Sequence, residues 1–116
     1  MKGLAMLIIA IGITASARAS HYYIGKGDVN ALKAAITASN TNNAPDTIHL
    51  YPYSIYNLNT VDNVFVFESY ALPVILLDNY NSANKLTIFG NGAQLVLDTA
   101  ALDNVKILNL AGTVDI

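Results

Sequence analysis

The chain contains no cysteine, which excludes disulfides, thiolate zinc sites, thiol redox chemistry and a lipid-modified N-terminal cysteine. It also lacks any Asn-x-Ser/Thr sequence, so we expect no N-glycosylation. Charged residues make up only 12% of the chain, and the formal net charge is −2. Because so few cations cannot neutralise a run of phosphates, we expect binding neither to nucleic acid nor to anionic membrane surfaces.

The N-terminus has the pattern of a secretory signal. Lys2 supplies a positive charge, and Leu4–Ile13 is a continuous run of apolar residues and glycine. Such a run is shorter than the roughly 20 residues that cross a bilayer. The small residues that follow satisfy the cleavage rule after Ala17 or after Ala19. We therefore predict a signal peptide over residues 1–19, a secreted or cell-surface protein, and no membrane span after cleavage.

One helix is predicted in the mature chain, over about residues 28–39. Asp28 stands at the N-cap, where its carboxylate can accept the free amide hydrogens of the first turn. Val29, Leu32 and Ile36 then recur at helical spacing. The asparagine-rich segment that ends in Pro45 stops the helix.

Beyond Pro45 the sequence predicts strands, over residues 47–50, 56–58, 64–67, 72–77, 85–89, 93–97 and 105–110. Leu86–Gly90 and Leu108–Gly112 both read apolar–polar–apolar before a glycine, 22 residues apart, which is typical of a solenoid. Asn91-Gly92 between two strands favours instead a tight hairpin in an antiparallel meander. Local chemistry leaves both alternatives open, and the recurrence favours stacked coils.

The order of these segments resembles the N-terminal cap and first coils of right-handed parallel β-helix proteins of the pectate-lyase-like superfamily. The likeness covers residues 21–116 and is carried by the helix pattern leucine–x–x–alanine–isoleucine, by a proline-led strand and by a strand that ends in Gly-Asn-Gly. The residues concerned are Leu32, Ala35, Ile36, Pro45–Leu50, Tyr56–Leu58, Leu72–Ile75 and Leu86–Ala93.

This resemblance implies a mainly β fold, the start of a right-handed parallel β-helix with one N-terminal capping helix. Residues 20–45 would form the strand and capping helix, and residues 46–116 the first coils. Thr113–Ile116 looks like the start of another strand without a terminal cap. We therefore expect a truncated fragment of a longer protein, with an open C-terminal coil that invites self-association.

Few residues indicate chemistry. Asp78 and Asp98 each follow an apolar run, and stacked coils would bring them together as a calcium site or an acid–base pair; turn capping is the simpler interpretation. His21 and His49 have no spacing that indicates a ligand set, and His49 is expected to point outward. Gly25-x-Gly27 does not predict nucleotide binding, because Asp28 would repel a phosphate.

Tyrosines are the remaining candidates, because exposed tyrosine clusters can stack on sugar rings. They are Tyr51, Tyr53, Tyr56, Tyr70 and Tyr80, of which Tyr56 is expected to point inward.

Lyases of the superfamily use a calcium-binding acidic cluster with a basic residue, and the related hydrolases use grouped aspartates. Neither motif is recognisable, and no arginine follows Arg18. We assign no catalytic, cofactor or metal residue. We expect a non-catalytic surface scaffold for adhesion or contact with polysaccharides or host cell-surface glycans. The alternative is the N-terminal piece of a polysaccharide lyase or glycoside hydrolase without its catalytic coils.

Overall fold

A computed structural model describes residues 19–41, 44–65, 67–76, 85–108, 110–111 and 114–115. The signal peptide predicted over residues 1–19 therefore lies, except for Ala19, outside the described residues. No helix in the described part is long and apolar enough to cross a membrane.

The described elements follow in the order β1 (His21–Tyr23), α2 (Val29–Ser39), β2 (Asp46–His49), β3 (Ile55–Leu58), β4 (Asn63–Phe65), β5 (Glu68–Tyr70), β6 (Ile75–Leu76), β7 (Leu86–Phe89), β8 (Gln94–Leu97), β9 (Val105–Lys106), β10 (Leu110–Ala111) and β11 (Val114–Asp115).

The helix prediction is confirmed. The Asp28 carboxylate accepts a hydrogen bond of 3.0 Å from the amide nitrogen of Ala31, as an N-cap should. At the other end, the side chain of Asn40 donates to the carbonyl of Val74 and accepts from the amide of Leu76, at 2.9 and 2.8 Å. These two bonds attach the C-terminal end of α2 to β6.

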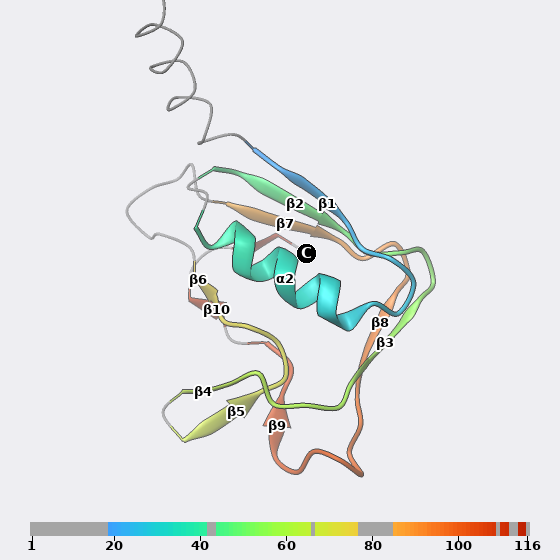
Figure 1. Cartoon of the computed structure of the whole chain (residues 1–116), viewed down its shortest axis with the longest axis vertical. Coiled ribbons are helices and arrows are strands. Elements are labelled where there is room, and N and C mark those ends of the chain that lie inside the picture. The colour runs from blue at the N-terminus through green and yellow to red at the C-terminus, as the bar shows by residue number, and fades with distance from the viewer. Residues whose placement is uncertain are drawn as a thin grey trace, which may run out of the picture.

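Short strands form four small sheets around the helix (Figure 1). The largest has the order β1-β2-β7-β11, and its neighbouring strands are parallel. Two further parallel pairs, β3–β8 and β6–β10, lie toward the N-terminal and C-terminal ends of α2, respectively. The fourth sheet is mixed, because β5 is antiparallel to β4 and parallel to β9.

The prediction of a parallel β-helix is wrong. The described chain is a small β-rich globule with short strands in mixed parallel and antiparallel sheets and one helix. The apolar run expected as one strand over residues 64–67 instead reverses at Phe67, where φ is 64°, and β5 folds back on β4.

The 22-residue recurrence is not a structural period either. Leu86 aligns with Val114, and Leu110 aligns with Ile75, so the two similar segments do not pair with each other. An apolar–polar–apolar pattern before a glycine specifies a strand that meets a turn, but it does not specify the partner of that strand.

The hairpin alternative is also wrong, although the predicted turn forms. Asn91 and Gly92 have φ angles of 51° and 75°, and the amide of Ala93 bonds to the carbonyl of Gly90 at 2.9 Å. The strands on either side belong to different sheets, since β7 pairs with β2 and β11 while β8 pairs with β3. The turn therefore redirects the chain from one sheet to the next.

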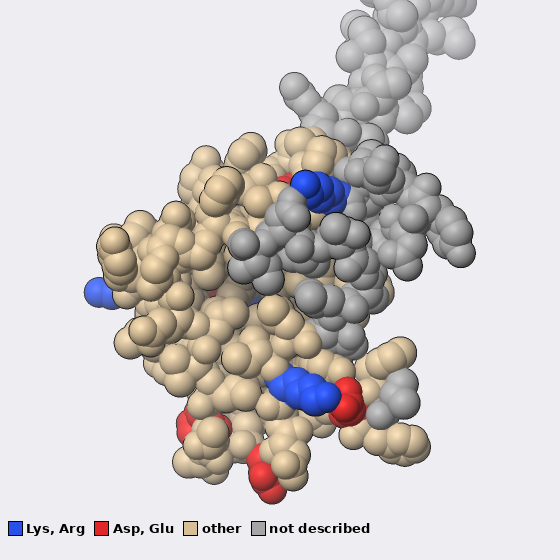
Figure 2. Space-filling view, turned by 180° about the vertical axis from the view of Figure 1, so that it is seen from behind, with Lys and Arg blue, Asp and Glu red and all other residues tan. Residues whose placement is uncertain are grey.

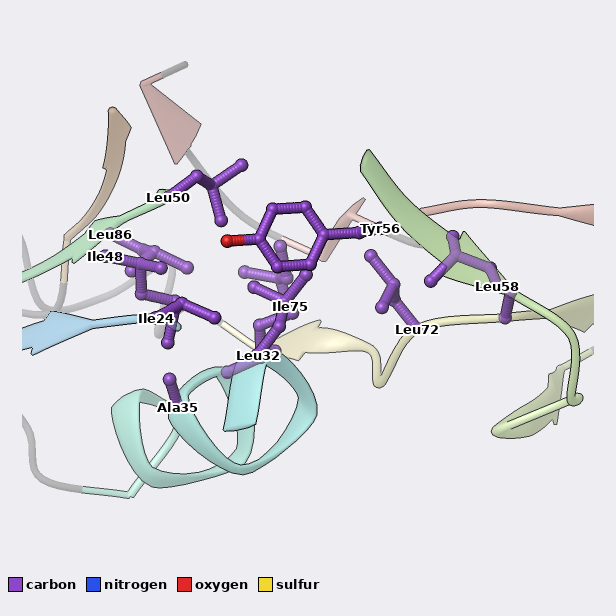
Figure 3. Packing of buried hydrophobic residues seen from close by; sticks show 12 residues of the cluster. Ile24, Leu32, Ala35, Ile48, Leu50, Tyr56, Leu58, Leu72, Ile75 and Leu86 are labelled. Atoms are coloured by element: carbon purple, nitrogen blue, oxygen red, sulfur yellow. The ribbon is translucent and has the colours of Figure 1, made fainter. Parts of the chain in front are cut away.

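One apolar cluster fills the space between α2 and the sheets (Figure 3). Its buried members lie between Ile24 and Leu86, and residues such as Leu95 and Val105 are partly buried against it. Among the buried members are Leu32, Ile36, Ile48, Tyr56, Leu72, Ile75 and Leu86. Tyr56 has an exposed fraction of 0%. Its hydroxyl accepts from the amide of Tyr51 at 2.9 Å and donates to the carbonyl of Gly25 at 3.1 Å. The expectation that Tyr56 points inward is confirmed.

The cluster contains an apolar cavity of about 170 Å³, whose lining includes Leu32, Leu72, Leu95 and Gly90. A methyl group at Gly90 would meet no atom within 4 Å, and the backbone there is not left-handed. At Gly92, by contrast, φ is +75° and a Cβ would lie 2.7 Å from the ring of Tyr53. A side chain therefore fits without strain at Gly90, whereas at Gly92 it would be strained and would clash with Tyr53.

We predict that Gly90→Ala raises the free energy of unfolding by about 0.5 kcal/mol, because alanine restricts the unfolded chain and adds a methyl group beside the cavity. Gly92→Ala is the matched control and should lower it by about 1 kcal/mol or more, since alanine is strained in the left-handed region. Urea denaturation monitored by circular dichroism measures both. A shift of the same sign for the two variants would contradict this description of the turn.

Candidate functional site

Four ring side chains from three neighbouring strands form a row on the outer face of the largest sheet. They are His21 and Tyr23 of β1, His49 of β2 and Phe89 of β7, here called the aromatic row. Successive residues of a strand point to opposite faces. Their neighbours Ile48 and Ile88 pack in or against the core, so the row faces away from it.

Strand register brings the rings into contact. Tyr23 aligns with His49, and His49 aligns with Phe89. The centroids of the Tyr23 and His49 rings lie 4.5 Å apart with an interplanar angle of 8°. Those of His49 and Phe89 lie 5.2 Å apart at 23°. Tyr23, at the β1 end of the row, is 76% exposed, and Phe89, at the β7 end, is 50% exposed. Both of these side chains are therefore accessible to a ligand in solution.

The two histidines also share a hydrogen bond, since Nδ1 of His21 and Nε2 of His49 are 3.0 Å apart. One ring therefore donates and the other accepts. Two imidazole nitrogens are fewer than the three or four protein ligands of a typical zinc site. No group of three or more His, Cys, Asp or Glu side chains suited to a metal occurs in the described part of the chain.

The strands that carry the aromatic row are nearly free of charge. Asp46 is the one Asp, Glu, Lys or Arg residue within β1, β2 and β7, and it is buried. The view from behind shows scattered charged side chains on a largely uncharged surface (Figure 2). The four rings carry no carboxylate, ammonium or guanidinium group, and the lysine nearest to them along β7 is Lys85, which directly precedes that strand. Rings without such groups suit a neutral ligand.

Of the five tyrosines predicted as stacking surfaces for sugars, some are exposed and others are buried. Tyr56 and Tyr70 are buried, so they offer no stacking surface, while Tyr51 and Tyr53 are exposed. Tyr53 is 85% exposed and its ring lies against Gly92. Its amide bonds to the carbonyl of Asn91 at 3.1 Å, which places this ring beside the turn that follows β7. Tyr80 lies outside the described residues.

The predicted pair of aspartates is not brought together by any described contact. Asp78 lies outside the described residues. Asp98 accepts hydrogen bonds from the amides of Ala100 and Ala101, at 3.1 and 3.3 Å, so it caps the turn after β8. This is the simpler of the two interpretations of Asp98.

Sequence reasoning missed a polar cluster on the mixed sheet. The Glu68 carboxylate accepts a hydrogen bond from the ammonium of Lys106 and another from the hydroxyl of Tyr70, at 2.5 and 2.7 Å. The hydrogen bond from Lys106, followed by that from Tyr70, lowers the pKa of Glu68. Hydrogen bonding to Glu68 raises the pKa of Tyr70 and that of Lys106. The side chains of Lys106 and Glu68 are open to solvent while Tyr70 is buried, and the cluster joins β5 to β9, so its visible role is structural.

We predict that Glu68 makes the stability of the protein depend on pH. Since its pKa is lower in the folded state, its contribution is complete above the ordinary value of 4.5 and disappears as the pH falls through the folded value. Urea denaturation should therefore separate wild type from Glu68→Gln at pH 7, and the two should converge in acid. Asp103→Asn, at an exposed site, is the control and should track wild type at each pH. A constant gap between wild type and Glu68→Gln would contradict the prediction.

Comparisons of the chain with protein-family models, with curated proteins and with solved structures find no match. They lend no support to the predicted resemblance to the pectate-lyase-like superfamily. The aromatic row is therefore the feature of the molecule that indicates a function.

Proposed function

We propose that this protein is an exported, non-catalytic surface scaffold that contacts neutral glycans through the aromatic row. The observation that carries the proposal is the cross-strand stack of Tyr23, His49 and Phe89 on an open sheet face. Export rests on the signal peptide predicted from the sequence.

The row can contact both the apolar C–H face and the hydroxyl groups of a sugar. The C–H groups of a sugar ring form an apolar face that packs against aromatic surface, while the tyrosine hydroxyl and the imidazole nitrogens can exchange hydrogen bonds with sugar hydroxyls. Because the rings of Tyr23, His49 and Phe89 stack on one another, the row presents ring edges along its length and ring faces at its ends. It therefore suits a polysaccharide chain better than a small molecule, which needs a concave pocket.

The lack of cations in the strands of the row favours neutral glycans over acidic ones. Binding a uronic-acid polymer requires cations beside the carboxylates, as recognition of anions does in general. The strands β1, β2 and β7 carry no lysine or arginine, and a single lysine, Lys85, directly precedes β7. One cation is too few to pair with a run of carboxylates. We therefore expect neutral polymers such as glucans or mannans to bind in preference to polygalacturonate.

The test is a binding measurement with neutral oligosaccharides, and with polygalacturonate in parallel. Tyr23→Ala and Phe89→Ala should each weaken binding about fivefold, because losing one ring contact costs about 1 kcal/mol. Phe65→Ala removes an equally exposed ring from β4, outside the row, and is the matched control that should bind like wild type.

Equal loss of binding in Phe65→Ala and in the row variants would contradict the proposal, as would the absence of binding to every neutral glycan. Release of reducing sugars from any of these polymers would contradict its non-catalytic part.

A further inference from the structure

Asp46 is a buried carboxylate with an incomplete set of partners. It is 2% exposed and lies at the start of β2. Its Oδ1 accepts a hydrogen bond of 2.8 Å from the backbone nitrogen of Ser20. Its Oδ2 is also buried, but it has no hydrogen-bond partner among the described residues. Buried carboxylate oxygens are expected to find donors or an opposite charge, because desolvation is otherwise uncompensated.

Backbone hydrogen bonds of the sheet hold both Ser20 and Asp46 in place. The carbonyl of Ser20 accepts from the amide of Thr47 at 2.9 Å, which begins the pairing of β1 with β2. The amide of Asp46 bonds to the carbonyl of Lys85 at 2.8 Å on the other side. The strand ladder therefore keeps the Ser20 nitrogen and the Asp46 backbone close to each other.

The same nitrogen follows one of the two predicted cleavage points. Cleavage after Ala19 would convert it from a peptide N–H, with one hydrogen, into an α-ammonium with three hydrogens and a positive charge. Such a group can donate to Oδ1 and to Oδ2 together, and its positive charge adds a Coulombic attraction to the carboxylate that the peptide N–H does not supply. Cleavage after Ala17 would leave Ser20 within the chain and Oδ2 without this donor.

We propose that the mature protein begins at Ser20 and that its α-ammonium forms an internal ion pair with Asp46. Cleavage of the signal peptide then also creates a positive charge, the α-ammonium of Ser20, beside the buried carboxylate of Asp46. This inference depends on the predicted signal peptide and is independent of glycan binding.

The first test is the intact mass of the chain, expressed with its own leader in a secreting bacterium and purified from the exported fraction. A mass that starts at Ser20 is the expected result. A start at Arg18, the product of cleavage after Ala17, would overturn the proposal.

The second test asks whether the N-terminal charge and Asp46 act together. In the protein that starts at Ser20, Asp46→Asn should lower Tm by about 5 °C or more. In a form that retains Ala19, the same substitution should have a clearly smaller effect, since the ammonium is displaced from the carboxylate. Equal losses of Tm in the two forms would mean that the neutral backbone bond is sufficient, and would overturn the ion pair.

A third measurement needs no substitution, and so holds even where Asp46→Asn does not fold. An acylating reagent at neutral pH should modify the α-amine of the Ser20 form about tenfold more slowly than that of the form with Ala19, because ion pairing keeps the amine protonated. Equal rates would count against the proposal.

Discussion

The hydroxyl of Tyr56 joins the bend between β2 and β3 to the segment that leads into α2, and the relative placement of these segments depends on it. It holds the carbonyl of Gly25, just before α2, and the amide of Tyr51, just after β2, while its ring lies in the core between them. Burying the hydroxyl of Tyr56 is favourable only where its hydrogen-bond partners are present, because an unpaired buried hydroxyl costs free energy. The turn into the helix and the bend between β2 and β3 are therefore fixed relative to each other.

The strands β2 and β7 contribute to the core on one face and to the aromatic row on the other. Their register is therefore tightly constrained. The inner face of β2 and β7 supplies Ile48 and Leu86 to the core, and the outer face supplies His49 and Phe89 to the aromatic row. A shift of one residue would exchange the two faces and expose the apolar set. The core thus selects the alignment that stacks the rings. This coupling explains how an exposed row can be ordered on the outer face of a sheet.

Local features could be predicted from the sequence, and long-range partners could not. The helix follows from Asp28 and its apolar spacing, and the left-handed turn follows from Asn91-Gly92. The choice of strand partners depends on packing across the whole core, which two similar segments do not encode. The parallel β-helix is therefore the wrong extension of a strand pattern that is itself only partly correct, since the run over residues 64–67 reverses and the run over residues 105–110 is not one strand. For the same reason, neither the contact of His21 with His49 nor that of Glu68 with Lys106 could be anticipated.

The central claim is that β1, β2 and β7 pair in the register that stacks Tyr23, His49 and Phe89. Nuclear Overhauser effects between ring protons measure this directly, because they require protons within about 5 Å and the closest ring centroids are 4.5 Å apart. The account predicts cross-peaks from His49 to both Tyr23 and Phe89, together with amide contacts between Tyr22 and Ile48 across the parallel strands. Absence of the ring cross-peaks, with contacts between β7 and β8 in their place, would contradict it.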